Sequence, residues 1–131
     1  MKISALKESL LPVFERHRSR LAAAYLFGST PREESGPLSD IDIAVLLYPA
    51  DRMQHGEFRL TLHADLCRAL KRNDIDLVIM NTARNLFLLD EIIRQGVLLF
   101  DADSGFRVEF EAKILHNSIE FRTRRQEVMG V

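Results

Sequence analysis

The chain has little of three features that often reveal the class of a protein: cysteine, net charge and long apolar runs. Cys67 is the only cysteine among 131 residues, so neither an intrachain disulfide nor a CxxC metal site can form. The net charge is −1, without the basic excess that tight nucleic-acid binding needs. No apolar run is long enough to span a bilayer, and charged residues interrupt the N-terminal stretch where a signal peptide needs an apolar core. We therefore expect a cytoplasmic protein without a membrane anchor.

Two common signatures of nucleotide binding are also missing. The sequence contains no GxGxxG and no GxxxxGK[ST], so nothing supports a dinucleotide-binding or P-loop fold.

The histidines lack the i,i+4 spacing of a metal site, and we interpret them as surface or helix-face residues: His17, His55, His63 and His116. An arginine cluster near the C-terminus is typical of a solvated helix end, with an acidic partner or RNA as the alternative contact: Arg122, Arg124 and Arg125.

Apolar periodicity predicts an α/β domain with a small mixed sheet and helices packed against it. The expected helices cover 3–18, 54–72, 83–95 and the chain from 105 onward, and the expected strands cover 21–27, 41–47, 75–80 and 97–100. Ser4 and Thr82 are expected to cap the first and third helices, and Gly96 to end the third. No repeat or linker divides the sequence, which predicts one domain over residues 1–131.

Two aspartates open the second expected strand. Side chains alternate along a strand, so Asp40 and Asp42 should point to the same side. Two like charges roughly 4 Å apart repel by about 4 kcal/mol at an effective dielectric near 20, unless a cation lies between them. Oxygen ligands of this kind suit Mg²⁺, which commonly brings phosphates with it. The pattern therefore indicates a metal–phosphate site.

A third carboxylate, Asp76, lies within the apolar run of the third expected strand. A carboxylate in that position is costly to desolvate unless it is paired, protonated or bound to a metal. If the second and third strands are neighbours, Asp76 can project beside Asp40 and Asp42. The alternative is that Asp76 is a charge on an edge strand that faces water.

Gly28 and Ser29 end the first expected strand and supply a possible phosphate contact. A glycine lets backbone N–H groups approach a phosphate closely, and serine adds a hydroxyl donor. A Gly-Ser pair alone is a weak signal, because it occurs in many turns. Its value here comes from the ten residues that separate it from Asp40.

The combined pattern Gly28-Ser29, ten residues, Asp40-Ile41-Asp42 resembles the GS-x10-DxD signature of the DNA polymerase β-like nucleotidyltransferase superfamily. Ser39 matches the serine that often precedes the first aspartate, and Asp76 fits the third carboxylate. Over residues 3 to about 100 the chain is similar to the minimal nucleotidyltransferases, the MNT or MntA-like group. Arg32 is in place for a phosphate contact, but three neighbours depart from the GSxARG loop often found in that group: Thr30, Pro31 and Glu33.

The resemblance implies transfer of a nucleotidyl group from a nucleoside triphosphate, usually with two Mg²⁺ ions. Asp40 and Asp42 would bridge both metals, and Asp76 would hold the catalytic metal and help to deprotonate the acceptor. Gly28 and Ser29 would hold the β- and γ-phosphates, with Arg32 as an auxiliary cation.

Within the minimal group, the resemblance further implies an antitoxin that silences a HEPN-domain RNase toxin by transferring AMP from ATP to a tyrosine. Because the chain has no room for an acceptor domain, we expect a second polypeptide or a second copy to complete the site, as a hetero- or homo-oligomer. Two alternatives stay open. One is an idle antitoxin that neutralises its partner by binding, and the other is a small-molecule nucleotidyltransferase of the aminoglycoside type.

Overall fold

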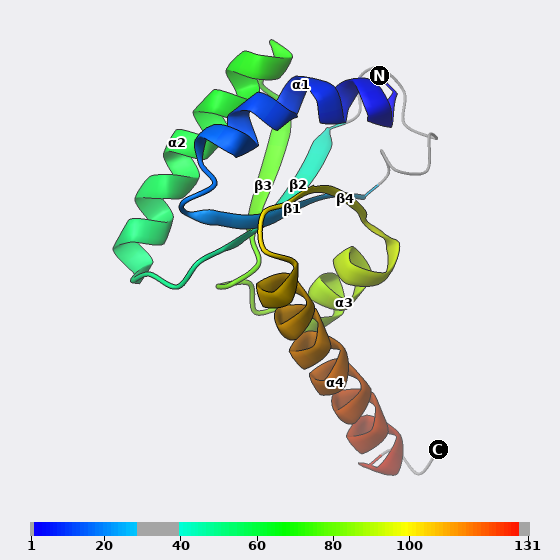
Figure 1. Ribbon diagram of the computed structural model, residues 1–131. Helices are drawn as coiled ribbons and strands as arrows, with labels where there is room; N and C mark the ends of the chain where they lie inside the picture. Colours follow the sequence, from blue (N-terminus) through cyan, green and yellow to red (C-terminus); the bar gives the residue numbers. More distant parts are fainter. Residues whose placement is uncertain (1, 29–39, 129–131) are drawn as a thin grey trace.

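The computed structural model describes residues 2–28 and 40–128, with side chains up to Arg124. Eight elements follow one another in the order α-β-β-α-β-α-β-α (Figure 1). They are α1 (Ile3–Arg16), β1 (Leu21–Phe27), β2 (Ile41–Leu47), α2 (Arg52–Leu70), β3 (Ile75–Ile79), α3 (Leu86–Gln95), β4 (Val97–Asp101) and α4 (Ser104–Val128). The predicted α/β class and the mixed sheet are confirmed.

The four strands form one sheet in the order β3-β2-β1-β4. β1 pairs antiparallel with both β2 and β4, whereas β2 and β3 run parallel. A parallel pair needs a crossover connection, and α2 supplies it. Because β2 and β3 are adjacent in the sheet, Asp76 of β3 can lie beside Asp42 of β2.

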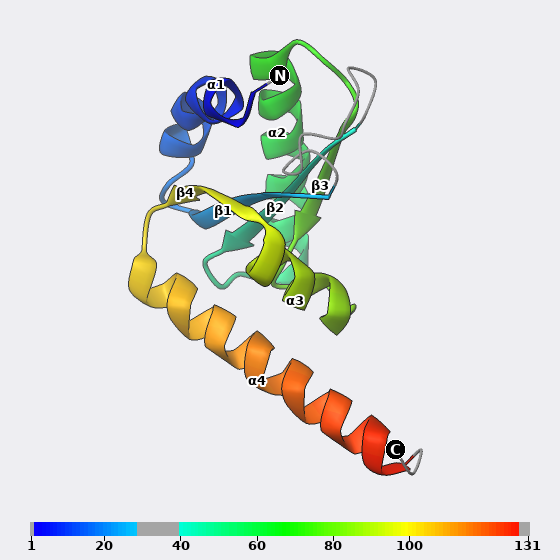
Figure 2. The same ribbon diagram turned by 90° about the vertical axis from the view of Figure 1, so that its right-hand side faces the viewer.

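Each face of the sheet has its own apolar core. Helices α1 and α2 cover one face, and α3 with the first turns of α4 covers the other (Figures 1 and 2). β1 and β2 are buried on both faces, as their nearly unbroken apolar sequences require of central strands. On the α1/α2 face the core includes Leu10, Phe14, Ile43, Leu62, Leu66, Leu77 and Ile79. On the α3/α4 face it includes Ala22, Ala23, Tyr25, Ala44, Leu46, Met80, Leu89 and Ile92.

Side chains of α2 and of the turn after β3 occupy the outer edge of β3. Each carbonyl group of β3 that points away from β2 accepts a hydrogen bond. The pairs are Ile75 O with His63 Nε2 (2.8 Å), Leu77 O with Arg59 Nη2 (2.9 Å) and Ile79 O with Thr82 N (3.3 Å). Arg59 and His63 are four residues apart, so one face of α2 presents both donors to alternate residues of the strand.

The predicted N-caps were wrong, although the first helix does begin at residue 3 as expected. Ser4 lies inside α1, whose N-cap is Lys2 without a side-chain bond. α3 begins three residues after the sequence suggested, and Asn85, not Thr82, accepts the hydrogen bond from Leu88 N–H. Pro12 lies inside α1, which continues past it to Arg16.

Gly96 does end α3, but tight packing explains the glycine. Its φ of −72° is open to any residue. A Cβ atom there would lie 2.4 Å from Ile92 O and 3.2 Å from Leu26 O, both backbone atoms. Glycine therefore lets the end of α3 pack directly against β1.

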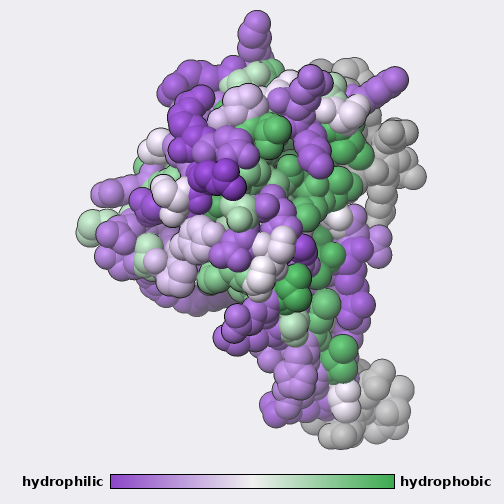
Figure 3. Space-filling model, in the orientation of Figure 1, coloured by the Kyte–Doolittle hydropathy of each residue, from purple (hydrophilic) through white to green (hydrophobic). Residues whose placement is uncertain are grey.

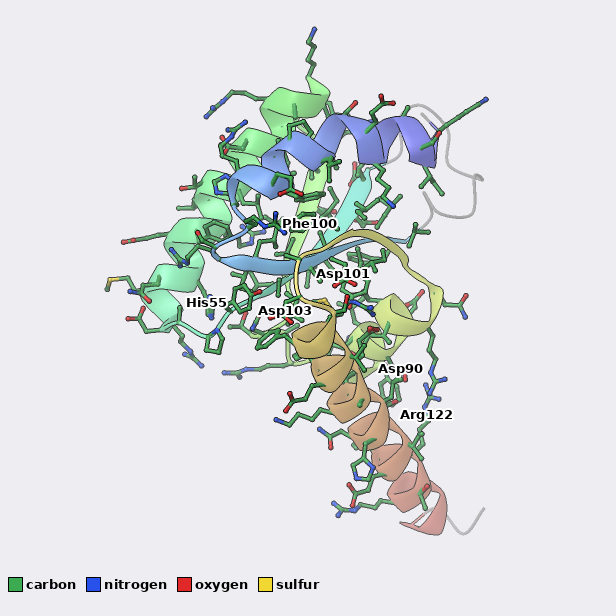
Figure 4. The ribbon with its side chains drawn as sticks, in the orientation of Figure 1. His55, Asp90, Phe100, Asp101, Asp103 and Arg122 are labelled. Carbon is green, nitrogen blue, oxygen red and sulfur yellow. The ribbon has the colours of Figure 1, made fainter. Side chains whose placement is uncertain are left out.

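Helix α4 extends well past the sheet (Figure 2). Its 25 residues span roughly 37 Å at 1.5 Å per residue. Arg122 of α4 forms an ion pair with Asp90 of α3 at 3.3 Å (Figure 4). Phe121 packs edge-on against Phe87 of α3. Apolar side chains nevertheless remain exposed along α4, among them Val108 and Ile119, and Figure 3 shows such residues running down the helix. No helix in the described ranges is both long and apolar enough to cross a membrane.

Candidate active site

Two of the three predicted carboxylates lie side by side on adjacent strands. Asp42 of β2 is the register partner of Asp76 in the parallel β2–β3 pair. Both side chains are on the α3/α4 face of the sheet, since their neighbours Ile41, Ile43 and Leu77 fill the core on the other face. Asp42 is half-buried, and Asp76 is exposed. β3 is an edge strand, as the alternative for Asp76 supposed, yet the Asp76 carboxylate lies next to that of Asp42.

The pKa of Asp42 reflects this crowding. Burial, the negative charge of Asp76, a hydrogen bond with Asp76 and the charge of Asp40 together raise the pKa of Asp42 to about 6. A hydrogen bond between two carboxyl groups requires that one of them carries a proton. Without a cation, the pair therefore holds a proton more tightly than an isolated aspartate does.

Gly28 makes room for the Asp42 carboxylate. Its φ is +79°, in the region that side chains rarely adopt, and a Cβ atom would lie 2.2 Å from Asp42 Oδ2. Phe27, just before it, is the register partner of Asp42 across the β1–β2 pair. The end of β1 and the start of β2 thus bring the glycine against the carboxylate, which the sequence had linked only by spacing.

Asp40 lies just before β2 and is exposed. It acts through its charge on Asp42 and also on Arg72, which follows α2. Arg72 forms an ion pair with Asp74, and that hydrogen bond is the main reason that the pKa of Arg72 is raised and that of Asp74 is lowered. Sequence reasoning missed Arg72; its position in the Arg-Asn-Asp turn before Asp76 was the available signal.

The other predicted phosphate contacts, Ser29, Arg32 and Ser39, lie outside the described residues, as do Thr30, Pro31 and Glu33. Their roles stay predictions. So do the catalytic and metal-binding roles of Asp40, Asp42 and Asp76, for which the structure supplies positions only.

The chemistry of this pair suits a hard cation that brings ligands of its own. In the described part of the chain, no three His, Cys, Asp or Glu side chains are grouped closely enough to hold a metal ion. Neither Asp42 nor Asp76 forms an ion pair with a described Lys or Arg, so both carboxylates can still bind a cation. Mg²⁺ usually completes its six oxygen ligands with waters and substrate phosphates around one or two carboxylates. The residues present therefore fit Mg²⁺ that arrives with a nucleotide.

The raised pKa of Asp42 predicts how stability depends on pH in EDTA. The folded pKa lies above the unfolded value of 3.8, so the native state binds more protons between roughly pH 4 and pH 6. The free energy of unfolding should therefore fall across this window, relative to Asp42→Asn, by about 1 kcal/mol once solvent screening is allowed for. Chemical denaturation of both proteins at pH 4, 5, 6 and 7 measures the difference. Parallel curves for the two proteins would contradict the crowding of the carboxylates.

The polymerase β nucleotidyltransferase family matches residues 8–105, about three-quarters of the chain. The chain belongs to this family. Its α/β fold with a mixed four-stranded sheet is that of polymerase β-like nucleotidyltransferases. A search of curated proteins finds no match to this nucleotidyltransferase.

Several solved structures similar to this nucleotidyltransferase come from toxin–antitoxin complexes. One, a toxin–antitoxin with AMP-PNP, has a chain with 26% identity and a TM-score of 0.73, with 95% of each chain covered. Another holds a tri-AMPylated Shewanella oneidensis HEPN toxin with an MNT antitoxin (25% identity, TM-score 0.69, covering 97% of this chain and 95% of the other). A third is the toxin–antitoxin MntA–HepT, with 25% identity and a TM-score of 0.68, covering 97% of this chain and 96% of the other. The nucleotidyltransferase is therefore similar to MNT antitoxins along nearly its whole length.

Proposed function

We propose that this nucleotidyltransferase transfers AMP from ATP to a tyrosine of a HEPN-domain RNase and so acts as its antitoxin. The observation that carries the proposal is the contact between Asp42 and Asp76, which places two carboxylates on one face at the ends of paired strands. Similarity to MNT antitoxins supports the acceptor and the partner. The ATP-rich cytoplasm is the compartment in which we expect the reaction.

In this proposal, each residue at the site has a separate task. Asp40 and Asp42 would hold two Mg²⁺ ions, and Asp76 would hold the one nearer the acceptor. Bound Mg²⁺ supplies positive charge next to the attacking and leaving oxygens. Gly28 and Ser29 would contact the β- and γ-phosphates, with Arg32 and Ser39 beside them. Thr30, Pro31 and Glu33, which differ from the GSxARG pattern, would affect only the contacts of this loop with the phosphates.

The reaction is a displacement at the α-phosphorus of ATP. The tyrosine oxygen forms a new bond to the α-phosphorus. The bond from the α-phosphorus to the oxygen that bridges the α- and β-phosphates breaks, and pyrophosphate leaves. Asp76 is exposed, so a phenol from another polypeptide can reach it, and its carboxylate would help to remove the phenolic proton.

The proposal is tested by incubating the purified chain with Mg²⁺, α-³²P-labelled ATP and a HEPN-domain RNase from the same cell. We expect label on the partner, an intact mass increased by one or more AMP groups, and loss of its RNase activity. Neutralisation of the RNase without label, together with no heat of Mg–ATP binding, would instead favour the antitoxin that acts by binding alone. Label on an aminoglycoside with no protein partner present would favour the small-molecule enzyme.

A further inference from the structure

A basic pocket lies on the opposite face and at the opposite end of the sheet from the aspartates. Its volume is about 340 Å³, and its walls come from the first two turns of α2, the end of β3 and the turn that follows: Arg52, His55, Gly56, Arg59, Ile79, Thr82 and Arg84. Ile79 is three residues beyond Asp76 and belongs to the core of the α1/α2 face. The pocket is therefore separate from the candidate active site.

Three arginines bring positive charge to this pocket without a carboxylate to balance it. Among the described residues, no acidic side chain forms an ion pair with Arg52, Arg59 or Arg84. Arg59 is oriented by its two hydrogen bonds to Leu77 O, at 3.2 and 2.9 Å. The N-cap of α2, Asp51, carries a carboxylate that accepts a hydrogen bond from Gln54 N–H and offsets the partial positive charge of this helix end, so the positive charge of the pocket comes from the arginines.

His55 provides a second, independent indication of a ligand. The sequence suggested a surface or helix-face residue, but the side chain is only 7% exposed and lines the pocket beside the start of α2 (Figure 4). Its Nδ1 is buried and has no hydrogen-bond partner. A buried polar atom without a partner is rare and costly, and an imidazole nitrogen that carries a proton can donate to an anion. Because this Nδ1 is also shielded from solvent, the imidazole ring of His55 has to turn before Nδ1 can donate to an anion in the pocket.

The charge of the pocket indicates which anion it would take. A single carboxylate would balance one of three guanidinium groups, whereas a phosphate or pyrophosphate carries several charges and accepts hydrogen bonds on every side. Planar guanidinium groups bind phosphate oxygens in pairs of parallel hydrogen bonds. Gly56 leaves open space where a side chain would begin, so such a ligand can approach the backbone of α2.

We propose that this pocket is a second anion site that binds a small phosphate-bearing ligand, such as pyrophosphate or the phosphate tail of a nucleotide. The site is independent of the proposed AMP transfer, because it shares no residue with the candidate active site. Its ligand needs no metal, since the arginines supply the positive charge.

The test is calorimetric titration of the full chain with sodium pyrophosphate in EDTA, which removes the metal on which nucleotide binding at the aspartates depends. We expect saturable binding by the wild type and by Asp42→Asn, and affinity at least about tenfold weaker in the double variant Arg52→Gln/Arg84→Gln. Arg124→Gln, which removes an exposed arginine at the far end of α4, should bind like the wild type. In ¹⁵N spectra recorded during the titration, the His55 ring signals should shift, and the dissociation constant from these shifts should match the calorimetric value. Thermal denaturation of each variant shows whether it is folded.

Three results would overturn the proposal. They are no binding by a folded wild type, equal binding by the double variant and the wild type, and unchanged His55 signals at saturation. Parallel titrations with ATP and with adenosine show whether the pocket recognises phosphate groups or the nucleoside. Binding of pyrophosphate and ATP, but not of adenosine, supports the proposed phosphate site. Tighter binding of a single-stranded RNA oligonucleotide than of pyrophosphate, lost in the double variant, would replace the small ligand with RNA.

Discussion

Asp42→Asn should lower the rate of AMP transfer on the order of 10³-fold, the upper range for removing one preorganised electrostatic group. Asparagine keeps the shape of the side chain but removes the charge that would bind Mg²⁺ next to Asp76. The loss should appear in kcat, measured with labelled ATP at saturating Mg²⁺, because the missing charge acts on the transition state more than on the bound substrate.

The matched control is Asp51→Asn, which removes a carboxylate from the N-cap of α2 at the other end of the sheet. Asparagine is an equally good cap for the Gln54 N–H, so activity and stability should stay near wild type. In EDTA at pH 7, Asp42→Asn should be as stable as the wild type or more stable, because the repulsion at Asp42 is gone. Undiminished transfer by a folded Asp42→Asn protein would remove Asp42 from the mechanism.

Gly28→Ala should also impair the site, though less than Asp42→Asn does, by displacing the Asp42 carboxylate. The new methyl group would lie 2.2 Å from Asp42 Oδ2, on a backbone with φ of +79°. Either the carboxylate moves away from Asp76 or the loop shifts, and a displacement of about 1 Å can cost about 100-fold in rate. We expect that loss of activity, with a stability cost of about 1–3 kcal/mol for the strained backbone.

Gly105→Ala serves as the control for Gly28→Ala. In the first turn of α4, the added Cβ would lie 3.7 Å from its nearest neighbour, Asp103 Oδ1, and alanine favours the helix. This variant should retain activity and match or exceed wild-type stability, as measured by thermal denaturation. If Gly28→Ala behaved in the same way, the close contact between residue 28 and Asp42 would not matter to the enzyme.

The sequence predicted the strands because they depend on strong, local patterns, and the parallel β2–β3 pair then brought Asp76 beside Asp42. The short apolar runs of β1 and β2 favoured buried strands, for β1 by its length and the glycine that follows it, and Asp76 within an apolar run required a charged or polar partner. Spacing alone joined Gly28 to the aspartates. The structure added the physical reason, since the glycine adjoins the Asp42 carboxylate across the β1–β2 pair.

Features that depend on contacts between distant elements could not be predicted. The N-caps were misplaced because Ser4 and Thr82 are suitable residues by type, whereas packing decides where a helix begins. The basic pocket combines α2 with the end of β3, so it could not be predicted from sequence; the burial of His55 had a signal in its place three residues before Phe58 on the buried face of α2. Arg72 became relevant only when its turn was placed beside Asp40.

The occupied edge of β3 determines how an acceptor can approach. A protein segment often docks by adding itself to a sheet as a further strand, and this requires unpaired carbonyl groups along the edge. Here Arg59, His63 and Thr82 already use the three outward carbonyls of the strand that carries Asp76. In the proposed transfer, an incoming polypeptide would therefore present its hydroxyl on a protruding side chain over the face of the sheet, which suits a tyrosine better than a short serine.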